Sequence, residues 1–201
     1  MSDCGCKVEA KNAAQRKALV YLLLINGTMF VVEMIAGVLA SSTALIADSL
    51  DMLADATVYG ISLYAVGKSQ FRKTQTASLS GIFQMTLAGL VLLDVVRKFV
   101  SSSEPNSTSM IGIGAIALAA NIVCLCLISK HREGDVHMRA SWIFSKNDVI
   151  ANISVMVAGL LVILFNSQLP DLFIGLAIAL LVLRGGIQIL QEARGKTMSS
   201  S

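Results

Sequence analysis

The sequence predicts an all-α integral membrane protein, a six-transmembrane-helix bundle with N- and C-termini cytoplasmic and no C-terminal soluble domain. Three observations predict this class. Of the 201 residues, 55% are hydrophobic and only 14% are charged, whereas soluble domains carry about 25% charged residues. Six apolar segments reach the roughly 20 residues that a helix needs to cross a bilayer. Lys and Arg gather in alternate connections, which is the pattern that sets orientation in a membrane.

The six predicted spans follow one another with short connections. Ser41 and Ser42 alone separate the first two, so these should form a tight helical hairpin, and a Ser-rich segment with Pro105 joins the third to the fourth. Pro170 and Asp171 open the sixth, where proline fits the first turn and an acid suits the helix dipole. The spans are about 18–40, 43–67, 77–100, 110–129, 141–165 and 169–190.

These spans divide the chain into three parts. Residues 1–17 form a cytoplasmic arm, residues 18–192 the transmembrane domain, and residues 193–201 a short cytoplasmic tail. The first 17 residues are polar and basic, and the apolar run that follows them is of full length, so we expect no signal peptide.

Basic residues indicate which end of each span is cytoplasmic. On the opposite side only Arg97 and Lys98 occur, and Asp94 lies one turn before them, which predicts an ion pair within the helix. The net charge of +3 therefore reflects topology, and we expect no nucleic-acid partner. The residues assigned to the cytoplasmic side are Lys7, Lys11, Arg16, Lys17, Lys68, Arg72, Lys73, Lys130, Arg132, Arg139, Arg184, Arg194 and Lys196.

The second span carries the strongest chemical signal. Asp48, Asp51 and Asp55 fall within an arc of about 60° on a helix. Each costs roughly 2.5 to 3.5 kcal/mol at the centre of a membrane helix. The pattern predicts oxygen ligands for a divalent cation, with Asp51 and Asp55 one turn apart. The alternative for Asp48 is a hydrogen bond to a neighbouring hydroxyl, that of Thr43 or Ser49.

The fifth span supplies the expected partners. Asp148 and Asn152 share one helix face, and Asn147 precedes them. If this face opposes the second span, Asp148 completes a cluster of three carboxylates. The alternative is that Asp148 pairs with Lys146 or Arg139 near the cytoplasmic surface.

Two further sets of residues are weaker candidates. Asn26 and Glu33 lie seven residues apart on one face of the first span; Glu33 is either a group that carries protons or supports the site, or a partner in a helix–helix hydrogen bond. Cys4 and Cys6 in the arm either capture a soft cation before transport or have no role.

These residues bring the chain close to a known family. The stretch from Asn26 to Glu33, Gly37, and the stretch Ser42–Asp55 resemble the first two helices of the cation diffusion facilitator (cation efflux) family, and Ser145–Asp148 resembles the metal-site part of its fifth helix. The resemblance extends from about Arg16 to Arg194, so the chain looks like a member that has only the transmembrane domain.

The resemblance implies an exporter of Zn²⁺ or a related ion such as Cd²⁺, Co²⁺ or Mn²⁺, working by exchange for protons and as a homodimer in a bacterial inner (plasma) membrane. Carried onto this chain, the family's transport site falls on Asp51, Asp55, Phe144 and Asp148. Phe144 cannot bind a metal, so the remaining ligands are all oxygen, and such a site accepts hard ions such as Mn²⁺ more readily than a nitrogen- and sulfur-containing site does. Because clustered acids repel one another, a proton can replace a departing cation.

Two functions from different classes follow. The first is a proton-coupled exporter of divalent cations, with a transported Zn²⁺ ion and no permanent cofactor. The second, favoured by Phe144 and by the absence of the family's cytoplasmic domain, is a non-transporting metal sensor or a partner subunit of a full-length transporter. We expect no enzyme, because no Ser/His/Asp set, His-x-x-x-His pair or Gly-rich phosphate loop occurs in a suitable context.

Overall fold

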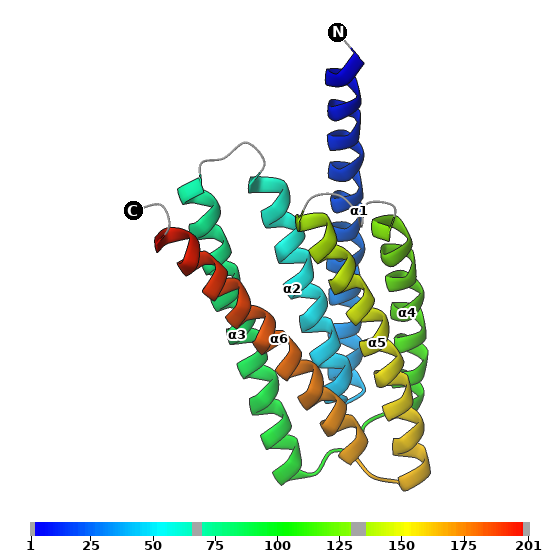
Figure 1. Cartoon of the computed structure of the whole chain (residues 1–201). Coiled ribbons are helices and arrows are strands. Elements are labelled where there is room, and N and C mark those ends of the chain that lie inside the picture. The colour runs from blue at the N-terminus through cyan, green and yellow to red at the C-terminus, as the bar shows by residue number, and fades with distance from the viewer. Residues whose placement is uncertain (1–2, 66–69, 130–135, 199–201) are drawn as a thin grey trace.

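The computed structural model describes residues 3–65, 70–129 and 136–198, and in these ranges the chain forms a bundle of helices (Figure 1). The start of α1 and the end of α6 lie at the same end of the bundle, as an even number of crossings requires. The helices are α1 (Asp3–Leu39), α2 (Thr43–Ala65), α3 (Gln70–Ser101), α4 (Ser107–Ser129), α5 (Val136–Phe165) and α6 (Leu169–Met198).

The predicted all-α six-helix bundle is confirmed, and each helix except α2 is longer than its predicted span. The predicted boundary at residue 17 falls inside α1, whose first turns project beyond the other helices (Figure 1). Five of the described helices are long and apolar enough to cross a membrane. The remaining helix, α2, carries three carboxylates, which lower its hydropathy. It nevertheless runs alongside the other helices.

Helices α1, α2, α4 and α5 pack as a group of four, and α3 and α6 form a pair that packs against this group. Contacts are most extensive between α1 and α2, between α4 and α5, and between α3 and α6. Helix α2 also contacts α3, α5 and α6, so it has packed neighbours on most sides. This central position explains how α2 can hold acids away from lipid, because the cost of a charge in a membrane falls when it faces the bundle interior.

Glycine permits the closest helix contacts. A Cβ added at Gly81 in α3 would lie 2.8 Å from the backbone oxygen of Gly186 in α6, and one added at Gly175 would lie 3.0 Å from the backbone carbon of Thr43. Small residues let membrane helices approach in this way. Gly89 and Gly112 have no heavy atom within 4 Å of the same position, so they play no such part.

A buried polar cluster closes the end of the bundle that lies opposite the termini. The Asp171 carboxylate, at the start of α6, accepts hydrogen bonds from the Ser42 hydroxyl (2.5 Å), the Thr43 amide (2.7 Å) and the Ala44 amide (3.1 Å). The Leu45 amide donates to the Ser42 hydroxyl at 3.1 Å. The free N–H groups of the first turn of α2 are thereby satisfied by a negative charge, which is the favourable arrangement at a helix N-terminus.

Helix α3 contributes to the same cluster. The predicted ion pair is confirmed, since Asp94 lies 2.7 Å from Arg97 and 3.0 Å from Lys98. Asp94 also accepts a hydrogen bond from the Thr43 hydroxyl, and Lys98 donates to the backbone oxygen of Ser41, each at 3.0 Å. We call Asp171, Asp94, Lys98, Ser42 and Thr43 the outer latch.

Candidate metal centre

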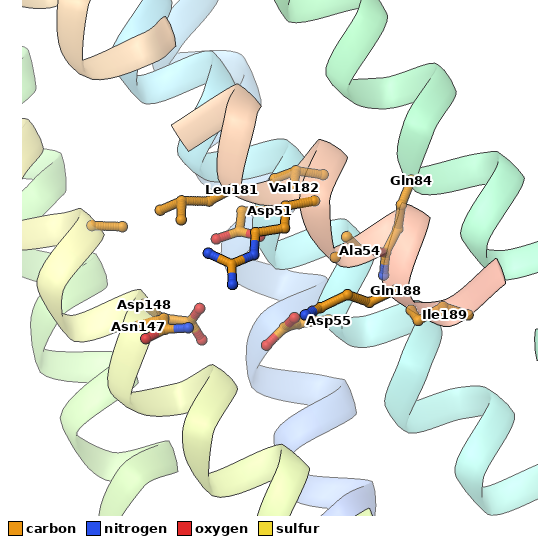
Figure 2. A pocket seen from close by; sticks show the side chains of 13 residues that line it. Asp51, Ala54, Asp55, Gln84, Asn147, Asp148, Leu181, Val182, Gln188 and Ile189 are labelled. Atoms are coloured by element: carbon orange, nitrogen blue, oxygen red, sulfur yellow. The ribbon is translucent and has the colours of Figure 1, made fainter. Parts of the chain in front are cut away.

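A cavity of about 320 Å³ lies between α2, α3, α5 and α6. Figure 2 shows carboxylates of α2 and α5 facing it from different walls. Most of the lining residues of α5 lie in the first half of that helix, and most of those of α6 lie in its second half. Both halves are on the side of the bundle where the termini lie, and the outer latch is at the opposite end. The lining residues are Asp51, Ala54, Asp55, Gln84, Asn147, Asp148, Ala151, Leu181, Val182, Arg184, Gly185, Gln188 and Ile189.

The α2 wall presents Asp51 and Asp55, as the spacing predicts. Asp55 is only 6% exposed, and Asp51 is half-buried. The Tyr59 hydroxyl donates a hydrogen bond of 3.0 Å to Oδ2 of Asp55. Tyr59 follows Asp55 by one helical turn and is fully buried, so it fixes one oxygen of that carboxylate. Sequence reasoning missed this residue, although the spacing of four is the signal for it.

The α5 wall presents Asp148 and Asn147. Asp148 is 3% exposed, and it lines the same cavity as Asp55 and Asp51. Its alternative partner Lys146 lies instead over the Trp142 ring, 6.0 Å from the centroid, and the side chain of Arg139 lies outside the described residues. The structure thus brings the three predicted carboxylates to one cavity.

Asn152 is buried one turn further along α5 and does not line this cavity. Its side-chain amide donates to the backbone oxygen of Asp148 at 2.9 Å. Its side-chain oxygen is buried without a hydrogen-bond partner among the described residues. Asn152 therefore supports the backbone at Asp148 in this conformation.

Glu33 and Asp48 lie behind the cavity wall. Both are buried, at 0% and 1% exposure, and neither is among the residues that line the cavity. Both oxygens of Glu33 and Oδ2 of Asp48 have no hydrogen-bond partner in the described part of the chain. The hydroxyls proposed as alternatives bond elsewhere, that of Thr43 to Asp94 and that of Ser49 to the backbone oxygen of Ile46.

Asn26 is fully buried on the same face of α1 as Glu33. Its amide donates to the backbone oxygen of Leu22 at 2.9 Å and to the Cys124 sulfur at 3.8 Å. It therefore joins α1 to α4 and does not contact the cavity lining.

The structure does not describe the side chains of three residues named in the sequence analysis. The side chains of Cys4, Cys6 and Phe144 lie outside the described residues. Among the side chains that are described, no three from His, Cys, Asp and Glu stand close enough to hold one ion together. The carboxylates of Asp51 and Asp55 lie on the α2 wall of the cavity, and that of Asp148 lies on the α5 wall.

Three polar lining residues were not predicted. Gln84 comes from α3, and Gln188 and Arg184 come from α6. Arg184 was assigned to the cytoplasmic surface from the distribution of basic residues, but it lies inside the apolar span Leu169–Gln191. A basic residue within an apolar run was the available signal, since such residues face a bundle interior or a water-filled cavity.

The fold and this cavity define a polytopic membrane protein with an acid-lined cavity among its helices. The chain belongs to the family of the cation efflux transmembrane domain, whose model matches residues 19–195. The predicted family is thereby confirmed. The apolar helices and the bacterial relatives together place the protein in a bacterial plasma membrane.

Several characterised proteins are similar to this chain. The zinc transporter ZitB of Yersinia pseudotuberculosis is 27% identical over 88% of this chain and 61% of its own length. A cadmium, cobalt and zinc/H(+)-K(+) antiporter of Bacillus velezensis is 24% identical over 92% of this chain and 63% of its own. The metal cation efflux system protein CzcD of Cupriavidus metallidurans is 23% identical over 75% and 51%, respectively. The chain spans about six-tenths of the length of the first two relatives.

Proposed function

We propose that this protein transports a divalent metal cation out of the cytoplasm, in exchange for protons, and that it is not an enzyme. One observation carries the proposal: Asp51 and Asp55 of α2 and Asp148 of α5 line one membrane-embedded cavity. Intramembrane carboxylates that face a cavity are typical of ion pathways. The names of the relatives, which include zinc transporters and a cation antiporter, support the same function.

The three carboxylates are the proposed ligands. A divalent cation supplies the positive charge that would draw them together, and Asn147 and water can fill the remaining positions, as they do for hard cations. Asn152 would hold the backbone of Asp148 in place. Zn²⁺ is the first candidate, because relatives carry zinc in their names, and Cd²⁺, Co²⁺ and Mn²⁺ follow.

Proton exchange has a physical basis in the same residues. When the cation leaves, the clustered carboxylates repel one another, and protons relieve that repulsion. Glu33 and Asp48 lie buried behind the cavity with unpartnered oxygens among the described residues, so they are the proposed additional proton carriers. Assembly as a homodimer remains a prediction from the family resemblance.

Ion flux into proteoliposomes tests the proposal. Purified protein would be given Zn²⁺, Cd²⁺, Co²⁺ or Mn²⁺ under an imposed pH gradient, with Asp55→Ala as the test variant. Glu104→Ala is the matched control, because Glu104 is an exposed acid in the connection between α3 and α4. Flux that follows the pH gradient, survives in Glu104→Ala and disappears in Asp55→Ala is expected. Folded protein that moves none of these ions would contradict the proposal and favour a sensor or partner subunit.

A further inference from the structure

Arg184 is an exposed residue that places a positive charge on the wall of a cavity proposed to bind a positive ion. It lies within the apolar span of α6, where a charged side chain is costly unless it faces protein or water. It lines the same cavity as Asp51, Asp55 and Asp148. Its guanidinium group carries a positive charge.

Arg184 has no other role among the described contacts. Among the side chains that the structure describes, the ion pairs join Asp94 to Arg97 and Lys98, at the far end of the bundle. The other polar residues of the cavity wall, Gln84, Gln188 and Asn147, are neutral. Arg184 is therefore the one fixed cation on the lining that the structure describes.

The charges of this lining can be counted. Three ionised carboxylates and one guanidinium leave two negative charges, which one divalent cation neutralises. Without Arg184 the same ion would leave one negative charge uncompensated in a low-dielectric site, and its attraction to the carboxylates would be stronger.

We propose that Arg184 is a specificity-determining residue that sets the charge of the cavity to match one divalent cation and, by repulsion, keeps that ion bound weakly enough to be released. The inference rests on the proposed function, because it takes Asp51, Asp55 and Asp148 as the ligands. An arginine that served only to orient α6 in the membrane would leave ion affinity unchanged when it is replaced by a neutral residue.

Zinc affinity of the purified full chain in nanodiscs tests this inference, measured by competition with a fluorescent zinc chelator. Arg184→Gln removes the charge and is expected to bind Zn²⁺ about tenfold more tightly or more, as one charge at close range implies. Arg184→Lys keeps the charge and should bind as the wild type does. Arg97→Gln is the matched control, because it removes an exposed guanidinium far from the cavity, and it should leave the affinity unchanged.

A second variant tests the same charge count from the other direction. Gln188→Arg adds a guanidinium to the wall and is expected to weaken Zn²⁺ binding by about tenfold, which keeps the inference testable if Arg184→Gln does not fold. Unchanged or weaker binding by folded Arg184→Gln, or unchanged binding by Gln188→Arg, would overturn it. Asp55→Ala separates the two proposals: if it binds Zn²⁺ like the wild type, the site itself is wrong, whereas lost binding in Asp55→Ala with unchanged binding in Arg184→Gln defeats only the role of Arg184.

Discussion

Tyr59 shows how a single residue can hold a carboxylate of the cavity wall in place. Its hydroxyl is 3.0 Å from one oxygen of Asp55, and both side chains are buried. The hydrogen bond occupies Oδ2, so the other oxygen of Asp55 remains available towards the cavity. A hydrogen bond to an ionised group also stabilises the charged form that a cation needs.

Tyr59→Phe should therefore weaken ion binding. Hydrogen bonds to charged groups contribute about 1.5 to 3 kcal/mol, so the dissociation constant for Zn²⁺ is expected to rise by about tenfold or more. Chelator competition measures it directly. Tyr21→Phe is the control, because Tyr21 is exposed on α1 and outside the cavity. Equal affinities for the two variants would show that the Tyr59 hydroxyl does not support Asp55.

At the scale of the helices, the contact between α3 and α6 depends on the absence of side chains. Gly81 and Gly186 lie against each other's backbone, and an added Cβ at either would come within 2.9 Å of the other's oxygen. The two helices cannot separate locally without disturbing Gln84 and Arg184, which they contribute to the cavity wall.

Gly81→Ala should destabilise the protein, because the added methyl group meets backbone that cannot move aside. Overpacking of this kind costs about 1 to 3 kcal/mol. Gly89→Ala, in the same helix, is the matched control: nothing lies within 4 Å of its added Cβ, and alanine is the better helix former. Thermal unfolding in detergent should give a lower midpoint for Gly81→Ala alone. Equal midpoints would mean that the two helices are not tightly packed there.

At the scale of the whole molecule, the cavity and the outer latch occupy different ends of the bundle. Asp171 joins the start of α6 to the first turn of α2 through three hydrogen bonds, and Lys98 joins α3 to the hairpin before α2. The latch therefore holds three helices together at the end of the bundle opposite the termini.

Asp171→Asn should loosen this end. The two carboxylate oxygens of Asp171 together accept three hydrogen bonds, whereas the asparagine amide has only one acceptor oxygen. The amide also lacks the negative charge that is favourable at a helix N-terminus. Amide hydrogen exchange in residues 42–48 is expected to be about tenfold faster, since hydrogen bonds to charged groups hold local structure closed. Glu104→Gln, which neutralises an exposed acid, should exchange like the wild type. Unchanged exchange in Asp171→Asn would show that the latch does not limit opening.

The sequence by itself determined the six helices and the acids that matter most. Apolar length identified all six spans, and α2 was among them despite its three carboxylates. Helical spacing placed Asp51 and Asp55 on one face, and local spacing also predicted the ion pairs of Asp94, because all these features depend on residues at most one turn apart.

Only the tertiary structure decided which distant residues share the cavity. Arg184 and Gln188 line the same cavity as Asp51 because α6 packs closely against α2 at Gly175, and Asp171 reaches the first turn of α2 for the same reason. From the sequence alone, a basic residue near the end of a span can equally well lie at the cytoplasmic surface or line an internal cavity. Which of these it is depends on how helices far apart in the chain pack together, and that packing is settled by side-chain and backbone fit, which helical periodicity does not encode.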